Sequence, residues 1–190
     1  MINNPGNPTA ENDAGYIEKV IIKDGTIVTI RAIQPGDAPL LQAEFEKLSP
    51  ETIYLRFLKS FKKLSDEQAE YFANVDYHDR MALVGTIKEE EGESVIAVAR
   101  YDVIRATHTR DAECAIVVRD DYQNRGLGTA IMIRLTRYAR QHGITAFVAT
   151  IHISNTRIIN FVRKSGLSFQ RKLLEPGIWE FKVNLAEIYF

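Results

Sequence analysis

Hydrophobic and polar positions along the first part of the chain predict a strand pair followed by a helix. Apolar residues dominate 20–23 and 26–30 on either side of Asp24-Gly25, a dipeptide that favours a tight hairpin. After Asp37, apolar side chains recur three and four residues apart as far as Lys47. This spacing predicts a helix with one apolar face, capped by the Asp37 side chain.

The middle of the chain predicts two short helices and a second hairpin. Ser49-Pro50-Glu51 and Ser65-Asp66-Glu67-Gln68 both have the form of a helix start, and the second is a capping box. Apolar residues then fill 81–87 and 95–104, which read as strands. The acidic segment 88–93 between them is expected to be a solvated hairpin loop.

The last third alternates strands and helices and shows no internal repeat. We expect strands over 112–118 and 146–151 and helices over 130–140 and 155–165. A closing pair of strands is expected over 167–174 and 179–185. Together these elements predict a mixed α+β sandwich whose central sheet is mostly antiparallel.

Composition is that of one modest domain. The chain has 190 residues, of which 45% are hydrophobic and 26% charged, enough for a single core. Residues 1–15 are rich in Asn, Pro and Gly and are expected to form a flexible leader, which leaves 16–190 as the folded domain.

Charge and cysteine content disfavour several classes of protein. The formal net charge is -1, so no overall basic field would hold nucleic acid or an anionic membrane surface. Cys114 is the single cysteine, which rules out an internal disulfide and leaves too few thiols for a structural zinc site, and no metal is expected. Without a basic and apolar leader at Met1 or a long apolar span, we expect a cytoplasmic protein.

One segment contains the residues that are expected to bind a ligand. It lies between the apolar strand 114–118 and the helix 130–140 and consists of Gln123, Asn124, Arg125, Gly126, Leu127, Gly128 and Thr129. A strand that turns through glycines into a helix binds phosphate, because the first helical N–H groups lack partners and carry the positive end of the helix dipole. The expected ligand is an anion such as a pyrophosphate.

Two familiar phosphate loops do not fit this segment. A P-loop requires wider glycine spacing and a following lysine, and a Rossmann turn requires a small residue where the chain has Ile131. The pattern [Q/R]-x-x-G-x-[G/A] fits Gln123 to Gly128 without a gap, although six residues also fit an ordinary turn before a surface helix. With this pattern the chain resembles the GNAT superfamily of acyl-CoA-dependent N-acyltransferases.

A second GNAT signature follows at the usual distance. The family pattern N-x-x-A-x-x-x-Y-x-x-x-G-F has its counterpart in Asn155 to Leu167. Ile158 replaces the small residue, Leu167 replaces the aromatic one, and Val162 stands where many members have a tyrosine thought to protonate the departing thiolate. No general acid is therefore assigned, and water is expected to supply that proton.

The resemblance implies a fold and a donor site. It implies a GNAT-like α+β fold whose strands splay apart at the acyl-CoA site, with acetyl-CoA as acyl donor and the loop 123–129 around its pyrophosphate. It further implies that the main chain of Val117 and Val118 pairs with the pantetheine arm, that the Val118 N–H stabilises the oxyanion, and that Asn155 lies beside the arm.

Amine transfer requires a base, because the acceptor arrives as an ammonium ion. Glu113 is the best candidate: it lies in an apolar strand ten residues before Gln123, close to where GNAT enzymes often place a catalytic glutamate. We expect partial burial to raise its pKa, although a lone strand glutamate also fits a solvated face. Asp120 and Asp121 are expected to stabilise a turn, and Asp102 and His108 are weaker candidates for substrate contact.

A narrower resemblance concerns the acceptor. The runs 48–57, 75–77, 81–84, 112–113 and 117–123 look like the acetyltransferase domain of Pat-type bacterial protein lysine acetyltransferases. This implies a lysine of an AMP-forming acyl-CoA synthetase as acceptor. Two alternatives remain open: a GNAT enzyme for a small amine, and a non-catalytic acyl-CoA sensor.

Overall fold

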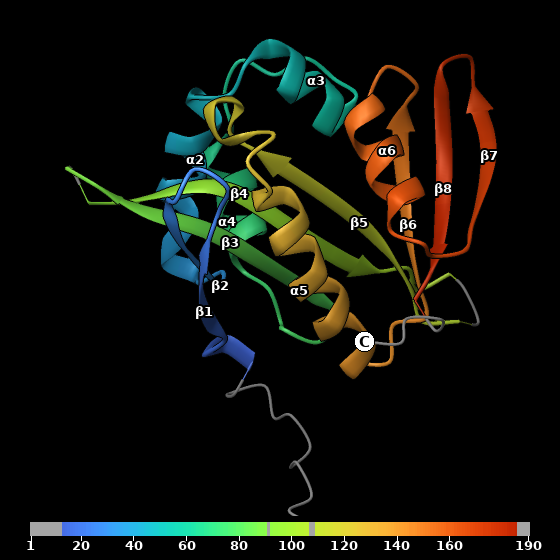
Figure 1. The fold of residues 1–190 in the computed structure, drawn as a ribbon, viewed down its shortest axis with the longest axis horizontal. Coiled ribbons are helices and arrows are strands. Elements are labelled where there is room, and N and C mark those ends of the chain that lie inside the picture. The colour runs from blue at the N-terminus through green and yellow to red at the C-terminus, as the bar shows by residue number, and fades with distance from the viewer. Residues whose placement is uncertain (1–12, 91, 107–108, 186–190) are drawn as a thin grey trace, which may run out of the picture.

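The computed structural model describes residues 13–90, 92–106 and 109–185, and these form one sheet with helices on both faces (Figure 1). Most of the expected leader, and His108, lie outside the described residues. Asp13 is buried and its Oδ2 atom lies 2.9 Å from Nε2 of His142, while the Gln34 side chain donates to the Ala14 carbonyl. The chain therefore packs against the fold from Asp13 onward, slightly before the expected boundary.

The sheet has eight strands in the order β1-β2-β3-β4-β5-β6-β8-β7. Their bounds are β1 Ile17–Ile21, β2 Ile27–Ala32, β3 Arg80–Glu89, β4 Gly92–Val103, β5 Asp111–Val118, β6 Ala146–His152, β7 Phe169–Glu175 and β8 Ile178–Asn184. Neighbouring strands are antiparallel except β5 and β6, which are parallel. The predicted mixed and mostly antiparallel sheet is confirmed, including the tight turn at Asp24-Gly25, where Gly25 has φ +87°.

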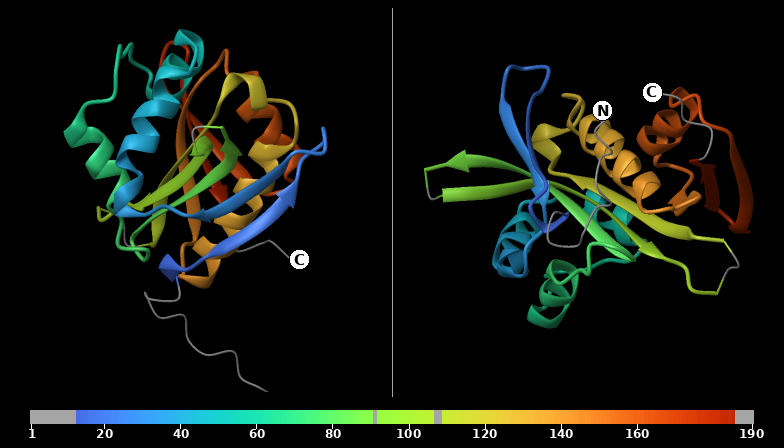
Figure 2. Two further views of the ribbon diagram at one scale, coloured as in Figure 1. Left: turned by 90° about the vertical axis from the view of Figure 1, so that its left-hand side faces the viewer. Right: turned by 90° about the horizontal axis from the view of Figure 1, so that it is seen from below.

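Helices cover the two faces of the sheet unequally. They are α2 Ala38–Glu46, α3 Pro50–Phe57, α4 Asp66–Ala73, α5 Leu127–Gln141 and α6 Thr156–Lys164, with 3₁₀ turns at Pro35–Asp37 and Asp120–Tyr122. Helices α2 and α4 pack on one face, and α5 packs on the other (Figure 2). None of the helices in the described part of the chain is long and apolar enough to span a bilayer.

Local capping chemistry explains where the short helices begin. The Ser49 hydroxyl accepts a hydrogen bond from the Thr52 amide at 3.1 Å, and Ser65 and Gln68 form the predicted reciprocal capping box. Asp37 behaves differently from the prediction, because its buried carboxylate accepts hydrogen bonds from Arg31 and from the Gln34 amide. A buried carboxylate gains more from a guanidinium than from a neutral cap.

The acidic hairpin is not simply a solvated loop. β3 and β4 stay paired as far as Glu89 and Gly92. The Glu89 carboxylate lies 3.1 Å from the Arg119 guanidinium, and that of Glu93 lies 3.0 Å from the Arg31 guanidinium. The expectation was wrong for these two residues because their partners come from elements that are distant in the sequence.

The largest apolar core lies between the sheet and α5. Leu127, Ile131 and Leu135 of α5 are fully buried there against strand residues such as Tyr101 of β4. Burying each aliphatic side chain of this kind stabilises the fold by about 1.5–3 kcal/mol relative to exposure. Because Leu127 is the first residue of α5, this burial fixes the start of the helix against the sheet.

Candidate functional site

β5 and β6 separate after a short stretch of pairing. They pair only from Asp111 with Ala146 to Glu113 with Val148, and beyond these residues the strands diverge (Figure 1). Two adjoining cavities of about 1030 Å³ and about 320 Å³ open at this splay. The splay leaves backbone groups of β5 without a strand partner, as an extended ligand would require.

The direction of the β5 backbone decides which groups face the gap. The Arg119 amide donates to the Ile96 carbonyl of β4 at 2.9 Å. Because backbone groups alternate along an antiparallel pair, the Val117 amide also points to β4, whereas Ile116 and Val118 point into the gap. Val117 lines the smaller cavity, but its backbone N–H and C=O therefore point towards β4 and not into the gap. Ile116, which the sequence analysis did not single out, takes the main-chain position.

The Val118 carbonyl is already occupied. The Gln123 side-chain amide donates to it at 2.9 Å and also to the Thr52 hydroxyl at 3.2 Å. Gln123 therefore ties the loop to both β5 and α3. The Val118 N–H points into the gap, where it could donate a hydrogen bond to a ligand oxygen.

Two loop residues adopt left-handed backbone conformations. Asn124 has φ +61° and Gly126 has φ +90°, whereas Gly128 already lies in the helical region. A Cβ atom on Gly128 would lie 3.7 Å from the side chains of Ile116 and Val118 without steric conflict. Gly126 thus makes the turn, and Gly128 lines the smaller cavity beside Ile116 and Val118.

The first turn of α5 offers free donors. Among the described residues, no oxygen accepts a hydrogen bond from the amides of Leu127, Gly128 and Thr129. Five of the seven loop residues line the smaller cavity: Gln123, Asn124, Gly126, Gly128 and Thr129. The other two side chains turn away, because Arg125 pairs with Asp24 and Leu127 is buried in the core.

Two cations reinforce the positive end of this helix. Lys23 lies at the turn after β1, and its backbone amide donates a hydrogen bond to the Arg125 carbonyl at 3.0 Å. Its side chain lies beside Gly126. Arg157 of α6 donates to the Gln123 side-chain oxygen. Both residues line the smaller cavity. Lys23 was not predicted from the sequence, since no local pattern links a hairpin turn to a loop about 100 residues later.

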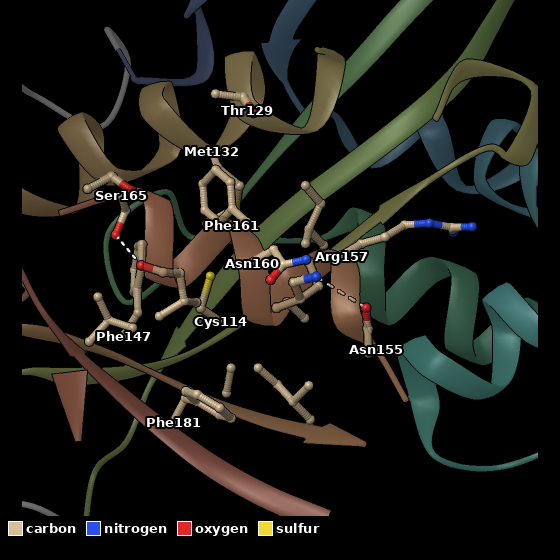
Figure 3. Close-up of a pocket in the computed structure, with 18 of the residues that line it drawn as sticks. Cys114, Thr129, Met132, Phe147, Asn155, Arg157, Asn160, Phe161, Ser165 and Phe181 are labelled. Atoms are coloured by element: carbon tan, nitrogen blue, oxygen red, sulfur yellow. Dashed lines mark hydrogen bonds between the residues drawn. The ribbon is translucent and has the colours of Figure 1, made fainter. Parts of the chain in front are cut away.

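The larger cavity is mainly apolar and extends between α5 and α6. Figure 3 shows Met132, Phe147, Phe161 and Phe181 around it. Val162 is buried and also lines it, so the position that would hold a tyrosine carries no proton donor. Asn155 lies at its edge, where its side-chain oxygen caps α6 by accepting from the Ile158 amide at 3.3 Å.

Cys114 also lines the larger cavity but is a poor nucleophile. Burial raises the pKa of its thiol to about 12, so the group stays neutral near pH 7. No group of three or more His, Cys, Asp or Glu side chains in the described residues is arranged to hold a metal ion.

Glu113 is exposed, so the expected partial burial was wrong. It lies opposite Asp102 in the β4–β5 register, on the sheet face where Val117 packs against Ile53 of α3. Its side chain lines neither cavity and has no ion pair among the described residues. The carboxylate of Asp102 forms ion pairs with Arg80 at 2.7 Å and with Arg100 at 3.3 Å. Glu113 is thus the unpaired carboxylate of this strand pair.

Asp120 and Asp121 have structural roles, although the shortest hydrogen bonds of Asp120 reach the start of α3 and not, as had been expected, the N–H groups of its own turn. Asp120 accepts hydrogen bonds from the Ser49 amide at 2.9 Å and the Thr52 hydroxyl at 2.7 Å, at the start of α3, and a longer one from the Gln123 side chain at 3.4 Å. Asp121 pairs with Arg119 at 2.8 Å. These bonds fasten the start of α3 beside the loop.

Comparison with known proteins gives a consistent result. The model of the acetyltransferase (GNAT) family matches residues 44–167. The chain is 27% identical over 150 residues to acetyltransferase PA5475 of Pseudomonas aeruginosa, covering 79% of this chain and 80% of that protein. It is 32% identical over 165 residues to acetyltransferase Pat of Mycolicibacterium smegmatis, covering 86% of this chain and 48% of that protein. The GNAT domain of S. lividans PAT superposes with a TM-score of 0.79 at 30% identity, covering 88% and 96% of the two chains.

Proposed function

The chain belongs to the acetyltransferase (GNAT) family, and on that premise we propose that it transfers an acetyl group from acetyl-CoA to a lysine side chain of a folded protein. The acceptor we favour is an AMP-forming acyl-CoA synthetase in the cytoplasm. The observation that carries the proposal is the splay of β5 from β6, which joins two cavities directly beside the free amides of α5.

The donor end of the site suits coenzyme A. Its pyrophosphate would accept hydrogen bonds from the amides of Leu127 to Thr129, with Lys23 and Arg157 supplying positive charge. The pantetheine arm would run along the open edge of β5, where the main chain of Ile116 and the Val118 N–H are available. Asn155, at the edge of both cavities, lies where the arm would pass.

The reaction proceeds by direct attack. Glu113 accepts a proton from the lysine ammonium, directly or through water, and the neutral nitrogen then attacks the thioester carbonyl carbon. The Val118 N–H stabilises the resulting oxyanion. When the carbonyl re-forms, the C–S bond breaks and the nitrogen gives its second proton to water. Coenzyme A leaves as a thiolate, which takes a proton from water. A covalent intermediate on Cys114 is disfavoured because that thiol stays neutral.

The acceptor side supports a protein substrate. The run 48–57, which resembles Pat-type enzymes, forms α3, and its residues Leu55 and Arg56 line both cavities. Glu113 lies on this same face of the sheet, opposite the face that carries α5. The chain spans 48% of the M. smegmatis Pat protein, so regulation of that whole protein is not carried over.

A turnover screen tests the proposal. Acetyl-CoA consumption is measured with purified acyl-CoA synthetases and with a panel of small amines, and products are identified by mass spectrometry. Acetylation of one synthetase lysine is expected. Turnover of a small amine with no synthetase modified would favour the small-amine alternative. Tight acetyl-CoA binding without any acetylation would favour a sensor.

A further inference from the structure

Arg56 is a charged residue at the point where the two cavities meet. It lies in α3 and lines the larger cavity together with Cys114 and the smaller one together with Val118. Its guanidinium carbon lies 4.7 Å from the centre of the Phe57 ring. The charge thus stands in mostly apolar surroundings, and the mechanism described above does not use it.

No anion of the described chain neutralises Arg56 at close range. Its guanidinium has no hydrogen bond or ion pair there, and its longer-range charged neighbours are Arg100, which repels it, and Glu113 and Glu44, which attract it. Burial, and then repulsion by Arg100, lowers its pKa to about 10, so it stays a cation near pH 7. A half-buried cation without a counter-ion costs free energy, which a ligand with negative charge would offset.

Two groups face this part of the site, Arg56 from α3 and the Val118 N–H from β5. The Glu113 carboxylate lines neither cavity and lies on the face of the sheet that carries α3. The acetyl group of acetyl-CoA is neutral before attack. Negative charge appears at this place only when the amine adds to the thioester.

We propose that Arg56 is a catalytic residue that stabilises the oxyanion formed on the thioester carbonyl oxygen. This inference rests on the proposed acyl transfer. The nitrogen lone pair forms the new C–N bond while the carbonyl π electrons move to oxygen, and Arg56 and the Val118 N–H hold that charge. As C=O re-forms, the C–S electrons leave with sulfur. The nitrogen loses its extra proton to water, and the thiolate takes a proton from water. A guanidinium in mostly apolar surroundings stabilises such a charge more strongly than a fully solvated one.

The test compares Arg56→Gln, Arg56→Lys and Arg56→Ala with Arg163→Gln, a matched control. Arg163 is exposed on α6 and lines neither cavity. With one acceptor that the wild type acetylates, kcat and KM for acetyl-CoA are measured alongside calorimetric affinity and the unfolding midpoint. For Arg56→Gln we expect kcat to fall by roughly 100- to 1000-fold with affinity nearly unchanged. Arg56→Lys should recover part of this loss, and millimolar guanidinium should partly restore Arg56→Ala.

Several results would overturn the assignment. A folded Arg56→Gln protein with near wild-type kcat would remove Arg56 from catalysis, and an equal loss of acetyl-CoA affinity would make it a binding residue. If the wild type prefers succinyl-CoA and Arg56→Gln loses only that activity, Arg56 instead recognises a carboxylate on the acyl group. A wild type that transfers acetyl groups to no acceptor would overturn the proposed function together with this role, whereas an active wild type with unaffected Arg56 variants would overturn this role alone.

Discussion

Gly128 is a position at which alanine should preserve or raise stability and valine should lower ligand affinity. It is the second residue of α5 and has an ordinary helical backbone, so alanine at this position causes no backbone strain. A glycine-to-alanine change inside a helix stabilises a protein by about 0.5–1 kcal/mol, and the new Cβ would make only ordinary contacts with Ile116 and Val118 at 3.7 Å. Gly128→Ala should therefore unfold at the same or a higher temperature than the wild type.

Valine at the same position should lower coenzyme affinity. In the proposed function, a phosphate would pass Gly128, which lines the smaller cavity, to reach the free amides of α5. The branched side chain of Gly128→Val would fill that space, so we expect acetyl-CoA affinity to fall at least tenfold, or about 1.4 kcal/mol. Calorimetric titration measures the affinity, and thermal unfolding confirms that the variant is folded. A well-folded Gly128→Val protein with wild-type affinity would refute the placement of the pyrophosphate.

Gly126→Val should also weaken acetyl-CoA binding, but with a loss of stability of about 1–2 kcal/mol because φ is +90° there; chemical denaturation would separate the two effects. Glu113→Gln should lower turnover by roughly a hundredfold with coenzyme affinity unchanged and should displace the rising limb of the kcat/KM–pH profile; an unaltered profile would move the base elsewhere. Hydrogen bonds from Ser94 and Arg119 lower the pKa of Glu89 from 4.5 to about 2, so its stabilising effect is complete above pH 4.5 and is lost towards pH 2. Glu89→Gln should accordingly be less stable than the wild type at pH 7 but similar at pH 2 in urea unfolding. Cys114→Ser should keep acetyl transfer within a few-fold, and complete loss in a folded variant would implicate the thiol in catalysis.

Short-range chemistry determined the features that the sequence predicted correctly. Each of these features depends on residues no more than three positions apart, so a short stretch of sequence is enough to predict it. They are the turn at Asp24-Gly25 and the helix caps at Ser49 and Ser65. The alternation of strands and helices depends on periodicity within each element. The loop 123–129 followed by Asn155 likewise indicated the family, because both signatures lie within continuous segments.

Tertiary structure alone decided which groups face the cavities. Whether Ile116 or Val117 offers its main chain depends on which edge of β5 meets β4, and no local pattern specifies that edge. Lys23 reaches Gly126, and Arg56 reaches the junction of the cavities, through packing between elements far apart in the chain. Glu113 is exposed because burial depends on what other elements cover, and the residues around it in sequence do not report that. Periodicity assigns a side chain to a face of its own strand, but only the packed neighbours determine what that face meets.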